Sequence, residues 1–349
     1  MKLPSRYELS GGSSGGGMGD IYFCSDKHLQ RDVVLKLLKD GEDERRLLDE
    51  QKALIQLRSK HVVQLFDVIS VNDGRDKTAL VLEYIDGENL EIGKYVPGES
   101  FLKILWQITC GLADIHAAGV IHRDIKPQNI RVDRGGVVKI LDFGLARREG
   151  EDANTRSIIG TIGFMAPELW KGATISFDAS IDVYAFGVTA LALLKIKPPR
   201  EIFERPPVPV ITGALSSLRG SLPDEIVSML EQCLSYKSDD RPSMRAVEEV
   251  LRQHLLKDKH RALVVMGGKA HELNATSRKM ALKYGEIGSV EIEYDGFKFS
   301  VLAFSGVVSI NNKSVSIGMG LPDCCVIAFG AAPARKFVTF DVSNPEVMS

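Results

Sequence analysis

The sequence has 349 residues, of which 44% are hydrophobic and 26% are charged, so it can bury at least one large core, and its length predicts two domains or more. The 44 basic residues are balanced by 46 acidic ones, for a formal net charge of −2. This balance argues against nucleic acid and against a membrane surface as the main partner, so the partners must be inferred from sites.

The pattern of apolar residues contains no segment that directs the chain to a membrane. Residues 1–12 lack the apolar core of a signal peptide, and the longest apolar run, residues 183–196, is shorter than the ~20 residues that a bilayer span needs. The five cysteines are odd in number and lack metal-ligand spacing, which is typical of thiols that stay reduced in a cytosol. The adjacent Cys324 and Cys325 fit either a redox pair or two small apolar residues of a strand. We therefore expect a cytoplasmic protein.

Short segments of strand composition surround a glycine cluster near the N-terminus: residues 6–9 precede it, and residues 20–26 and 31–39 follow. The cluster has the composition of a flexible linker, but its position between two strands favours a hairpin turn. Residues 43–59 carry leucines near helical spacing and predict an amphipathic helix, and residues 61–70 and 78–85 return to strand composition. We expect a small sheet that carries one helix.

The pattern changes to helices from Ser100 onward. Residues 100–119, 183–196, 223–236 and 243–256 have helical patterns, and Ser243 is a suitable N-cap for the last. Beyond residue 260 the chain becomes β-rich: residues 261–266 predict a strand, residues 275–285 a helix, and Asp295-Gly296 and Asn311-Asn312 two hairpin turns. We infer a separate C-terminal module.

Three stretches between the predicted helices carry chemistry. They are "VIHRDIKPQNIRV" at 120–132, "KILDFGLAR" at 139–147 and "GTIGFMAPE" at 160–168. In this order and spacing they resemble the eukaryotic-type protein kinases, and among these the bacterial and phage-type serine/threonine enzymes. The resemblance covers residues 7–256. It implies an α+β, bilobal kinase fold, with an N-lobe at 1–84 and a C-lobe at 85–257, followed by the β-rich module of unknown role at 258–349.

Phosphoryl transfer requires a site that holds a triphosphate, offsets its charge and aims a hydroxyl at it. The resemblance implies that Asp124 orients the substrate hydroxyl and accepts its proton, and that Lys126 contacts the γ-phosphate. Asn129 and Asp142 offer the hard oxygen ligands that Mg²⁺ prefers. The implied cofactors are ATP and Mg²⁺, with Mn²⁺ as an alternative metal.

The same resemblance implies a nucleotide pocket. Lys36 and Glu50 are 14 residues apart and in isolation would be two solvated charges, but the family pattern pairs them, with Lys36 on the α- and β-phosphates. Leu82 occupies the gatekeeper position before the hinge. The residues assigned to ATP binding are Ser14, Gly15, Gly16, Gly17, Met18, Gly19, Ile21, Val34, Lys36, Glu50, Leu82, Glu83 and Ile85.

Two positions of this pocket depart from the family pattern. Ser14 stands where the first glycine of the G-x-G-x-x-G loop is expected, and because serine disfavours positive φ, either the hairpin shifts or Gly15 takes the turn. Arg131 stands where an aliphatic residue usually packs beneath the adenine. Either the arginine stem does this packing or the pocket floor differs.

Other residues receive structural or regulatory roles by the resemblance. His122 packs with Phe143, Leu54 and Leu65 in a hydrophobic spine. Arg123, just before Asp124, implies activation by phosphorylation of Thr155 or Ser157, which otherwise are polar loop residues. The remaining assignments are Glu168 with Arg241 as a buried bridge, Asp182 as the anchor of the catalytic loop, and Thr161 as a substrate-loop residue typical of the serine/threonine branch.

The resemblance implies an ATP-dependent serine/threonine kinase that phosphorylates protein hydroxyls and autophosphorylates in its activation loop, with self-association as one route. The alternative is a pseudokinase that binds nucleotide or acts as a scaffold through its C-terminal module. That module could sense a ligand, recruit substrate or dimerise the chain. It lacks the arginine and serine pattern of a phosphothreonine-binding sandwich, and "GGK" at 267–269 lacks the spacing of a nucleotide loop. No nucleic-acid or membrane partner is expected.

Overall fold

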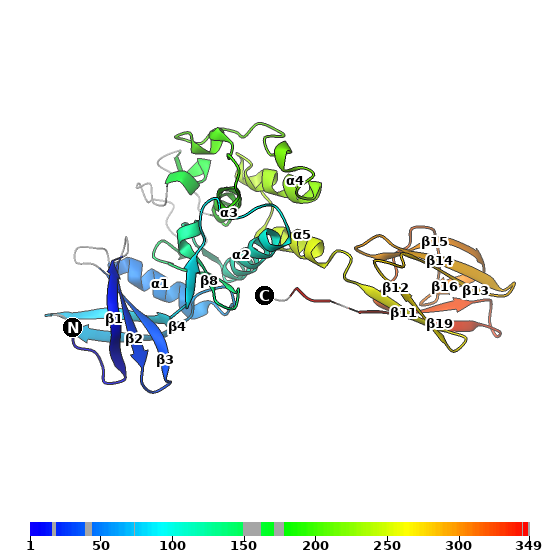
Figure 1. Ribbon diagram of the computed structural model, residues 1–349, viewed down its shortest axis with the longest axis horizontal. Coiled ribbons are helices and arrows are strands. Elements are labelled where there is room, and N and C mark those ends of the chain that lie inside the picture. Colours follow the sequence, from blue (N-terminus) through cyan, green and yellow to red (C-terminus); the bar gives the residue numbers. More distant parts are fainter. Residues whose placement is uncertain are drawn as a thin grey trace. The chain divides into compact units, whose positions relative to one another are not determined.

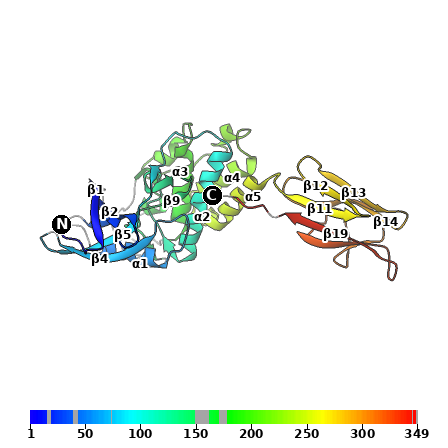
Figure 2. The same ribbon diagram turned by 60° about the horizontal axis from the view of Figure 1, so that its bottom comes forward.

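The computed structural model describes residues 1–15, 19–38, 44–72, 74–148, 162–170, 178–343 and 345–347. The chain divides into two compact units, Met1–Leu251 and Arg252–Met348 (Figures 1 and 2).

The first unit begins with a five-stranded antiparallel sheet in the order β1-β2-β3-β5-β4. Its inward side chains alternate along the strands, as in Val33 and Leu35, and both are fully buried. Figure 1 shows the helix α1 beside this sheet. The bounds are β1 (Tyr7–Gly15), β2 (Gly19–Asp26), β3 (Arg31–Leu38), α1 (Glu44–Gln56), β4 (Leu65–Asn72) and β5 (Asp76–Glu83).

The glycine cluster joins two paired strands. Ser14 of β1 lies opposite Ile21 of β2, and Gly15 lies opposite Asp20. Residues 16–18, between the two strands, lie outside the described residues. The expectation of a hairpin rather than a linker is therefore confirmed.

Helices are the main regular structure in the remainder of this unit, and the last of them, α5, continues past Leu251 into the second unit. The helix α3 is apolar on nearly all sides and is buried along most of its length. The Trp106 indole N–H donates to Glu248 at 3.1 Å and ties α2 to α5. The bounds are α2 (Glu99–Ala117), α3 (Ser180–Leu193), α4 (Asp224–Cys233) and α5 (Met244–Leu256), with 3-10 turns at Pro127–Asn129, Ile162–Phe164, Pro167–Trp170, Arg200–Phe203, Ser216–Leu218 and Ser238–Asp240.

Two small sheets lie among these helices. One has the order β6-β8-β9, and in the other β7 pairs with β10. Their strands are β6 (Gly87–Asn89), β7 (Val120–Ile121), β8 (Ile130–Asp133), β9 (Val138–Ile140) and β10 (Arg147–Arg148). The strand β8 lies at the end of the 120–132 stretch and β9 at the start of the 139–147 stretch. Their pairing therefore brings these two stretches side by side.

The second unit consists of two antiparallel sheets with a shared apolar core. One sheet has the order β12-β11-β19-β18-β16-β17, and the other has the order β13-β14-β15. Side chains of both sheets enter one core, for example Ile292 from one and Phe340 from the other. The bounds are β11 (Arg261–Met266), β12 (Lys269–Leu273), β13 (Lys279–Tyr284), β14 (Gly288–Tyr294), β15 (Phe299–Gly306), β16 (Val308–Ile310), β17 (Lys313–Ser314), β18 (Cys324–Phe329) and β19 (Lys336–Ser343).

Both predicted turns of this unit are present, and one predicted helix is wrong. Asp295 accepts the N–H groups of the two residues after Gly296, and Asn311 and Asn312 both have positive φ, as a type I′ hairpin requires. Residues 279–284 form β13 instead of a helix. Met280 and Leu282 alternate with exposed neighbours and pair with β14, so packing against the sheet overrides the helix propensity of this segment.

Cys324 and Cys325 are free thiols in strand β18, as the strand interpretation of this pair expects. None of the helices in the described ranges is long and apolar enough to cross a membrane.

Candidate active site

A buried cation joins two acids in the first unit. The Lys36 ammonium of β3 donates to both carboxylate oxygens of Glu50 on α1, at 2.8 and 2.7 Å, and to Asp142, after β9, at 2.7 Å. Lys36 and Glu50 are 7% and 1% exposed. Burial alone would lower the pKa of Lys36, but the two carboxylates raise it above its ordinary value. Lys36 is therefore a fixed cation, positioned by Glu50 of α1 and by Asp142 of the loop after β9.

A second cluster surrounds Asp124. Its carboxylate accepts hydrogen bonds from Lys126 at 2.7 Å and from the amide nitrogen of Asn129 at 2.8 Å. The 3-10 turn Pro127–Asn129 begins at a proline, whose fixed φ suits a first helical position. The Leu141 N–H donates to the Asn129 carbonyl at 2.8 Å, which holds this turn next to Asp142. Because its amide nitrogen faces Asp124, Asn129 presents its oxygen as an acceptor for a cation.

The loop that carries Asp124 is held from α3. Asp182 is fully buried and accepts the backbone N–H groups of His122 and Arg123, both at 2.8 Å, and a bond from the His116 ring at 3.0 Å. Burial raises the pKa of Asp182, but the bonds from His116 and His122 outweigh it and hold this pKa below its ordinary value. Arg123 has a φ of 70°, which this anchoring must sustain.

Packing and ion pairs support the same loop. The His122 and Phe143 rings are fully buried with centroids 4.7 Å apart, and His122 bonds the Leu141 carbonyl at 2.9 Å. Leu54 is buried and Leu65 is half-buried. Arg241 donates to both oxygens of Glu168, at 2.7 and 2.8 Å.

A cavity of about 320 Å³ is lined by Lys36, Glu50 and Asp142 of the first cluster and by Asn129 of the second. Its size falls in the range of small-molecule sites, ~300–1,000 Å³. Predicted residues that line it are Ile21, Val34, Lys36, Glu50, Leu82, Glu83, Ile85, Asn129 and Asp142, and Arg131 lines it as well.

The sequence interpretation missed several lining residues, among them Phe23, Val63, Tyr84, Asn89, Gln128 and Leu141. Phe23 had a readable signal, because it lies two residues after Ile21 on one strand and so shares its face. Asn89 and Val63 are brought to the cavity by pairing of distant segments, which no local pattern reveals.

Among the described residues, the predicted catalytic residues Asp124 and Lys126 do not line this cavity. Ser14, Gly15 and Gly19 lie in β1 and β2. Gly16, Gly17, Met18, Thr155, Ser157 and Thr161 lie outside the described residues.

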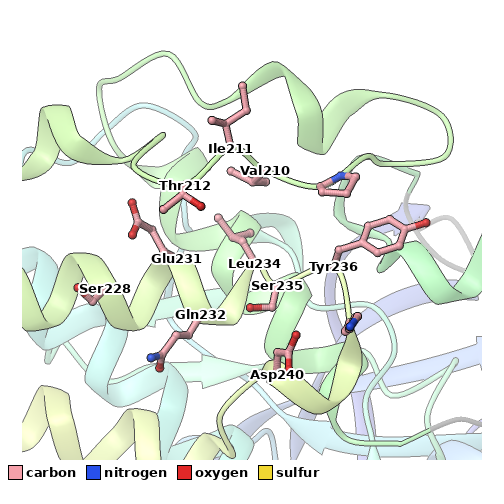
Figure 3. Close-up of a pocket in the computed structure, with 12 residues that line it drawn as sticks. Val210, Ile211, Thr212, Ser228, Glu231, Gln232, Leu234, Ser235, Tyr236 and Asp240 are labelled. Atoms are coloured by element: carbon pink, nitrogen blue, oxygen red, sulfur yellow. The ribbon is translucent and has the colours of Figure 1, made fainter.

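A larger cavity, of about 540 Å³, lies elsewhere in this unit (Figure 3). Figure 3 shows Val210, Ile211 and Thr212 on one side of it, and Leu234, Ser235 and Tyr236 on the other. Its lining includes none of the residues predicted for catalysis, metal binding or ATP binding. Size alone therefore does not identify the site.

The donor set fits a nucleotide with a divalent metal. Asp142 and Asn129 supply oxygen ligands, and in the described ranges no group of three or more His, Cys, Asp or Glu side chains could hold a metal by itself. A metal here would need further oxygens from phosphates and water, which is how Mg²⁺ binds at phosphoryl-transfer sites.

Fold and site together define a phosphotransferase-type nucleotide site, and comparison with known proteins identifies its family. Residues 12–255 match the model of the protein kinase domain, which covers well over half of the chain, so the chain belongs to the protein kinase family. This family implies ATP and a divalent metal as cofactors.

Two of the similar curated proteins come from Streptomyces coelicolor and Bacillus subtilis. A probable serine/threonine-protein kinase of Streptomyces coelicolor is 34% identical over 214 residues, which cover 57% of this chain and 31% of that protein. The serine/threonine-protein kinase PrkC of Bacillus subtilis is 31% identical over 205 residues, or 55% of this chain and 31% of that protein. The chain thus spans about a third of the length of the curated relatives it matches. The predicted resemblance to bacterial serine/threonine kinases is confirmed.

Proposed function

We propose that the chain is an active kinase that transfers the γ-phosphoryl group of MgATP to serine or threonine hydroxyls of proteins. The observation that carries this proposal is the direct contact of Lys36 with both Glu50 and Asp142 on one cavity, which Asn129 also lines while its amide nitrogen donates to Asp124. Each group that phosphoryl transfer requires is present, and nothing in the described residues favours a scaffold without turnover.

The chain's own residues divide the work. Bound MgATP supplies the phosphoryl group and a divalent charge that offsets the phosphates. Lys36, a fixed cation, orients the α- and β-phosphates, and Glu50 keeps its ammonium in place. Asp142 and Asn129 hold the metal. Asp124 orients the acceptor hydroxyl and takes its proton, and Lys126 beside it offsets charge on the transferred group.

The architecture follows the kinase pattern: an N-lobe at 1–84 that contains the five-stranded sheet, a C-lobe at 85–257, and the β-rich module at 258–349. We propose a cytoplasmic setting, Mg²⁺ rather than Mn²⁺ as the metal, and self-association for phosphorylation in trans. Arg123 supports activation by phosphorylation of Thr155 or Ser157, with Thr161 contacting the substrate segment. Phosphopeptide mapping of the active chain is expected to find label on at least one of Thr155 and Ser157; active protein without label on either contradicts this part.

The decisive experiment replaces Asp124 with Asn. We expect ATP-dependent phosphorylation of the chain and of a generic protein substrate to fall by about 10²–10⁴-fold, the usual contribution of a general base, while ATP still binds. Asp86→Asn is the matched control, because Asp86 is half exposed and pairs only with the surface Arg134 among its described contacts. Phosphorylation that is unchanged in Asp124→Asn would contradict the role of Asp124.

A further inference from the structure

Arg131 lies on the floor of the nucleotide cavity. It occupies β8, where it pairs with Asn89 of β6 on one side and with Lys139 of β9 on the other. Its half-buried side chain lines the cavity together with Asn89 and Asn129. The position thus brings a guanidinium to a place where the family resemblance implies an aliphatic residue.

The guanidinium of Arg131 is fixed by the backbone carbonyl of Gly87, which lies five residues after Leu82. The Nε and Nη2 atoms of Arg131 both donate to the Gly87 carbonyl, at 3.0 and 2.5 Å. Gly87 itself touches β8 so closely that a Cβ would lie 1.9 Å from the Val132 carbonyl oxygen. Only glycine permits this approach, so the carbonyl is held where the arginine reaches it.

The charge of Arg131 is balanced differently from the other charges of the cavity. The four other charged side chains that line it are all ion-paired: Lys36 with Glu50 and Asp142, and Glu83 with Lys139 at 2.9 Å. Within the described ranges, the contacts of Arg131 go to a neutral carbonyl. A cation without a carboxylate partner, fixed in orientation, therefore remains available to a ligand.

We propose that Arg131 is a base-binding residue whose guanidinium lies against the face of the nucleotide base. The five-stranded sheet contributes aliphatic side chains to the same cavity, Ile21 and Val34, so a planar ring would lie between an apolar wall and a cationic one. A guanidinium is flat, weakly hydrated and attracted to the electron-rich face of an aromatic ring. This inference rests on the proposed function, because it assigns the base subsite of that nucleotide site.

The test measures dissociation constants of the full chain for three probes: ATP, adenosine, which has the base without phosphates, and inorganic triphosphate, which has phosphates without a base. Arg131→Met keeps a flexible stem and removes the guanidinium, and Arg131→Lys keeps the charge and removes the plane. Arg134→Met is the matched control, because Arg134 follows the same strand but its side chain is 83% exposed.

We expect Arg131→Met to weaken the binding of ATP and of adenosine by the same factor, about three- to thirtyfold, which is the range of a cation–π contact. Triphosphate affinity stays within about twofold, Arg131→Lys gives a smaller loss of about two- to fivefold, and Arg134→Met changes none of the three. A matching loss of ATP and adenosine affinity supports a contact with the base.

Other results overturn the assignment. Parent-like adenosine affinity in a folded Arg131→Met shows that the guanidinium does not contact the base, and a loss confined to ATP and triphosphate assigns it to the phosphates. If Arg131→Met does not fold, parent-like adenosine affinity in Arg131→Lys has the same meaning. A parent chain that binds neither ATP nor adenosine overturns the proposed function as well, whereas a parent that binds and phosphorylates, with variants that bind adenosine equally, overturns the role of Arg131 alone.

Discussion

The two units of the chain bury different kinds of side chain. In the described ranges, every buried charged side chain lies in the first unit, among them Lys36, Glu50, Asp124 and Asp182. The core of the second unit is apolar, and its fully buried Tyr294 donates its hydroxyl to the Gly296 carbonyl at 2.8 Å. Burying a charge is costly unless it is paired, and Lys36, Glu50 and Asp124 all have ion-pair partners at the site. The apolar core of the second unit marks packing, and any binding function of that unit must lie on its surface.

The largest expected effect is on the core of the second unit. Phe340 is fully buried and its ring lies 5.5 Å from that of Phe299. Phe340→Ala is expected to destabilise this unit by about 3–5 kcal/mol, because it leaves a cavity in close-packed surroundings. Hydrogen exchange of residues 261–343 measures the loss. The matched control is Phe337→Ala on the same strand, 60% exposed, for which we expect less than about 0.5 kcal/mol.

The same variant tests whether the units are independent. Both tryptophans, Trp106 and Trp170, lie in the first unit, so tryptophan fluorescence follows its unfolding alone. We expect Phe340→Ala to leave this fluorescence transition and the ATP affinity unchanged. If the fluorescence transition moved together with the hydrogen exchange of the second unit, the two cores would unfold as one. The different interiors of the two units would then not correspond to separate stabilities.

Next in size is the buried carboxylate that anchors the catalytic loop. Asp182→Asn offers one acceptor oxygen in place of two and turns an N–H group toward backbone donors, so at least one buried donor loses its partner. We expect a loss of about 2–3 kcal/mol of unfolding free energy by urea titration with tryptophan fluorescence. Phosphorylation falls about 10²-fold, because the loop with Asp124 shifts. The control Asp86→Asn, at an exposed position, should change the unfolding free energy and the phosphorylation rate only slightly. Equal effects of the two variants would argue against the role of Asp182 as the anchor of the catalytic loop.

In the first unit, the sequence alone predicts the charged residues of the site well. It predicts the full set of residues that line the cavity less well. Lys36, Glu50 and Asp142 can be predicted because their order and spacing along the chain match the pattern of the protein kinase family. The contacts of Asn89 and Val63 with the cavity depend on pairing between segments that are distant in sequence, which leaves no local pattern.

The second unit shows the opposite limit. Its turns were predictable, since Asp295-Gly296 and Asn311-Asn312 select backbone conformations by their own chemistry. Lysine, methionine and leucine favour a helix over residues 275–285, but pairing with the neighbouring strand β14 makes residues 279–284 a strand. The role of the unit could not be predicted, because its buried residues report only packing.

A smaller effect is expected from the pH dependence of the same anchor. Burial opposes the charge of Asp182, but its hydrogen bonds hold its pKa below the ordinary value of 3.8. The unfolded chain therefore binds this proton more readily than the native one, so the stabilisation is fully present above about pH 4 and is lost as pH falls through the native pKa.

The free-energy gap between the parent and Asp182→Asn should accordingly be constant from about pH 7 to about pH 5 and shrink at lower pH, as the parent carboxylate becomes protonated. Urea titrations at a series of pH values measure it. A gap that does not change with pH down to the acid limit of folding would mean that the charge of Asp182 contributes nothing to its role.

The smallest expected effect concerns the glycine cluster. Ser14 lies in β1 opposite Ile21, in extended backbone that any residue adopts, so the serine at this position does not need positive φ. Ser14→Gly is therefore expected to leave ATP affinity within about twofold and to destabilise the hairpin by about 0.5–1 kcal/mol, the usual cost of glycine within a strand. Nucleotide titration and thermal unfolding measure the two quantities. ATP binding that becomes several-fold tighter in Ser14→Gly would show instead that the serine holds the hairpin away from the phosphates, and that this loop, more than the floor at Arg131, limits how the chain holds its nucleotide.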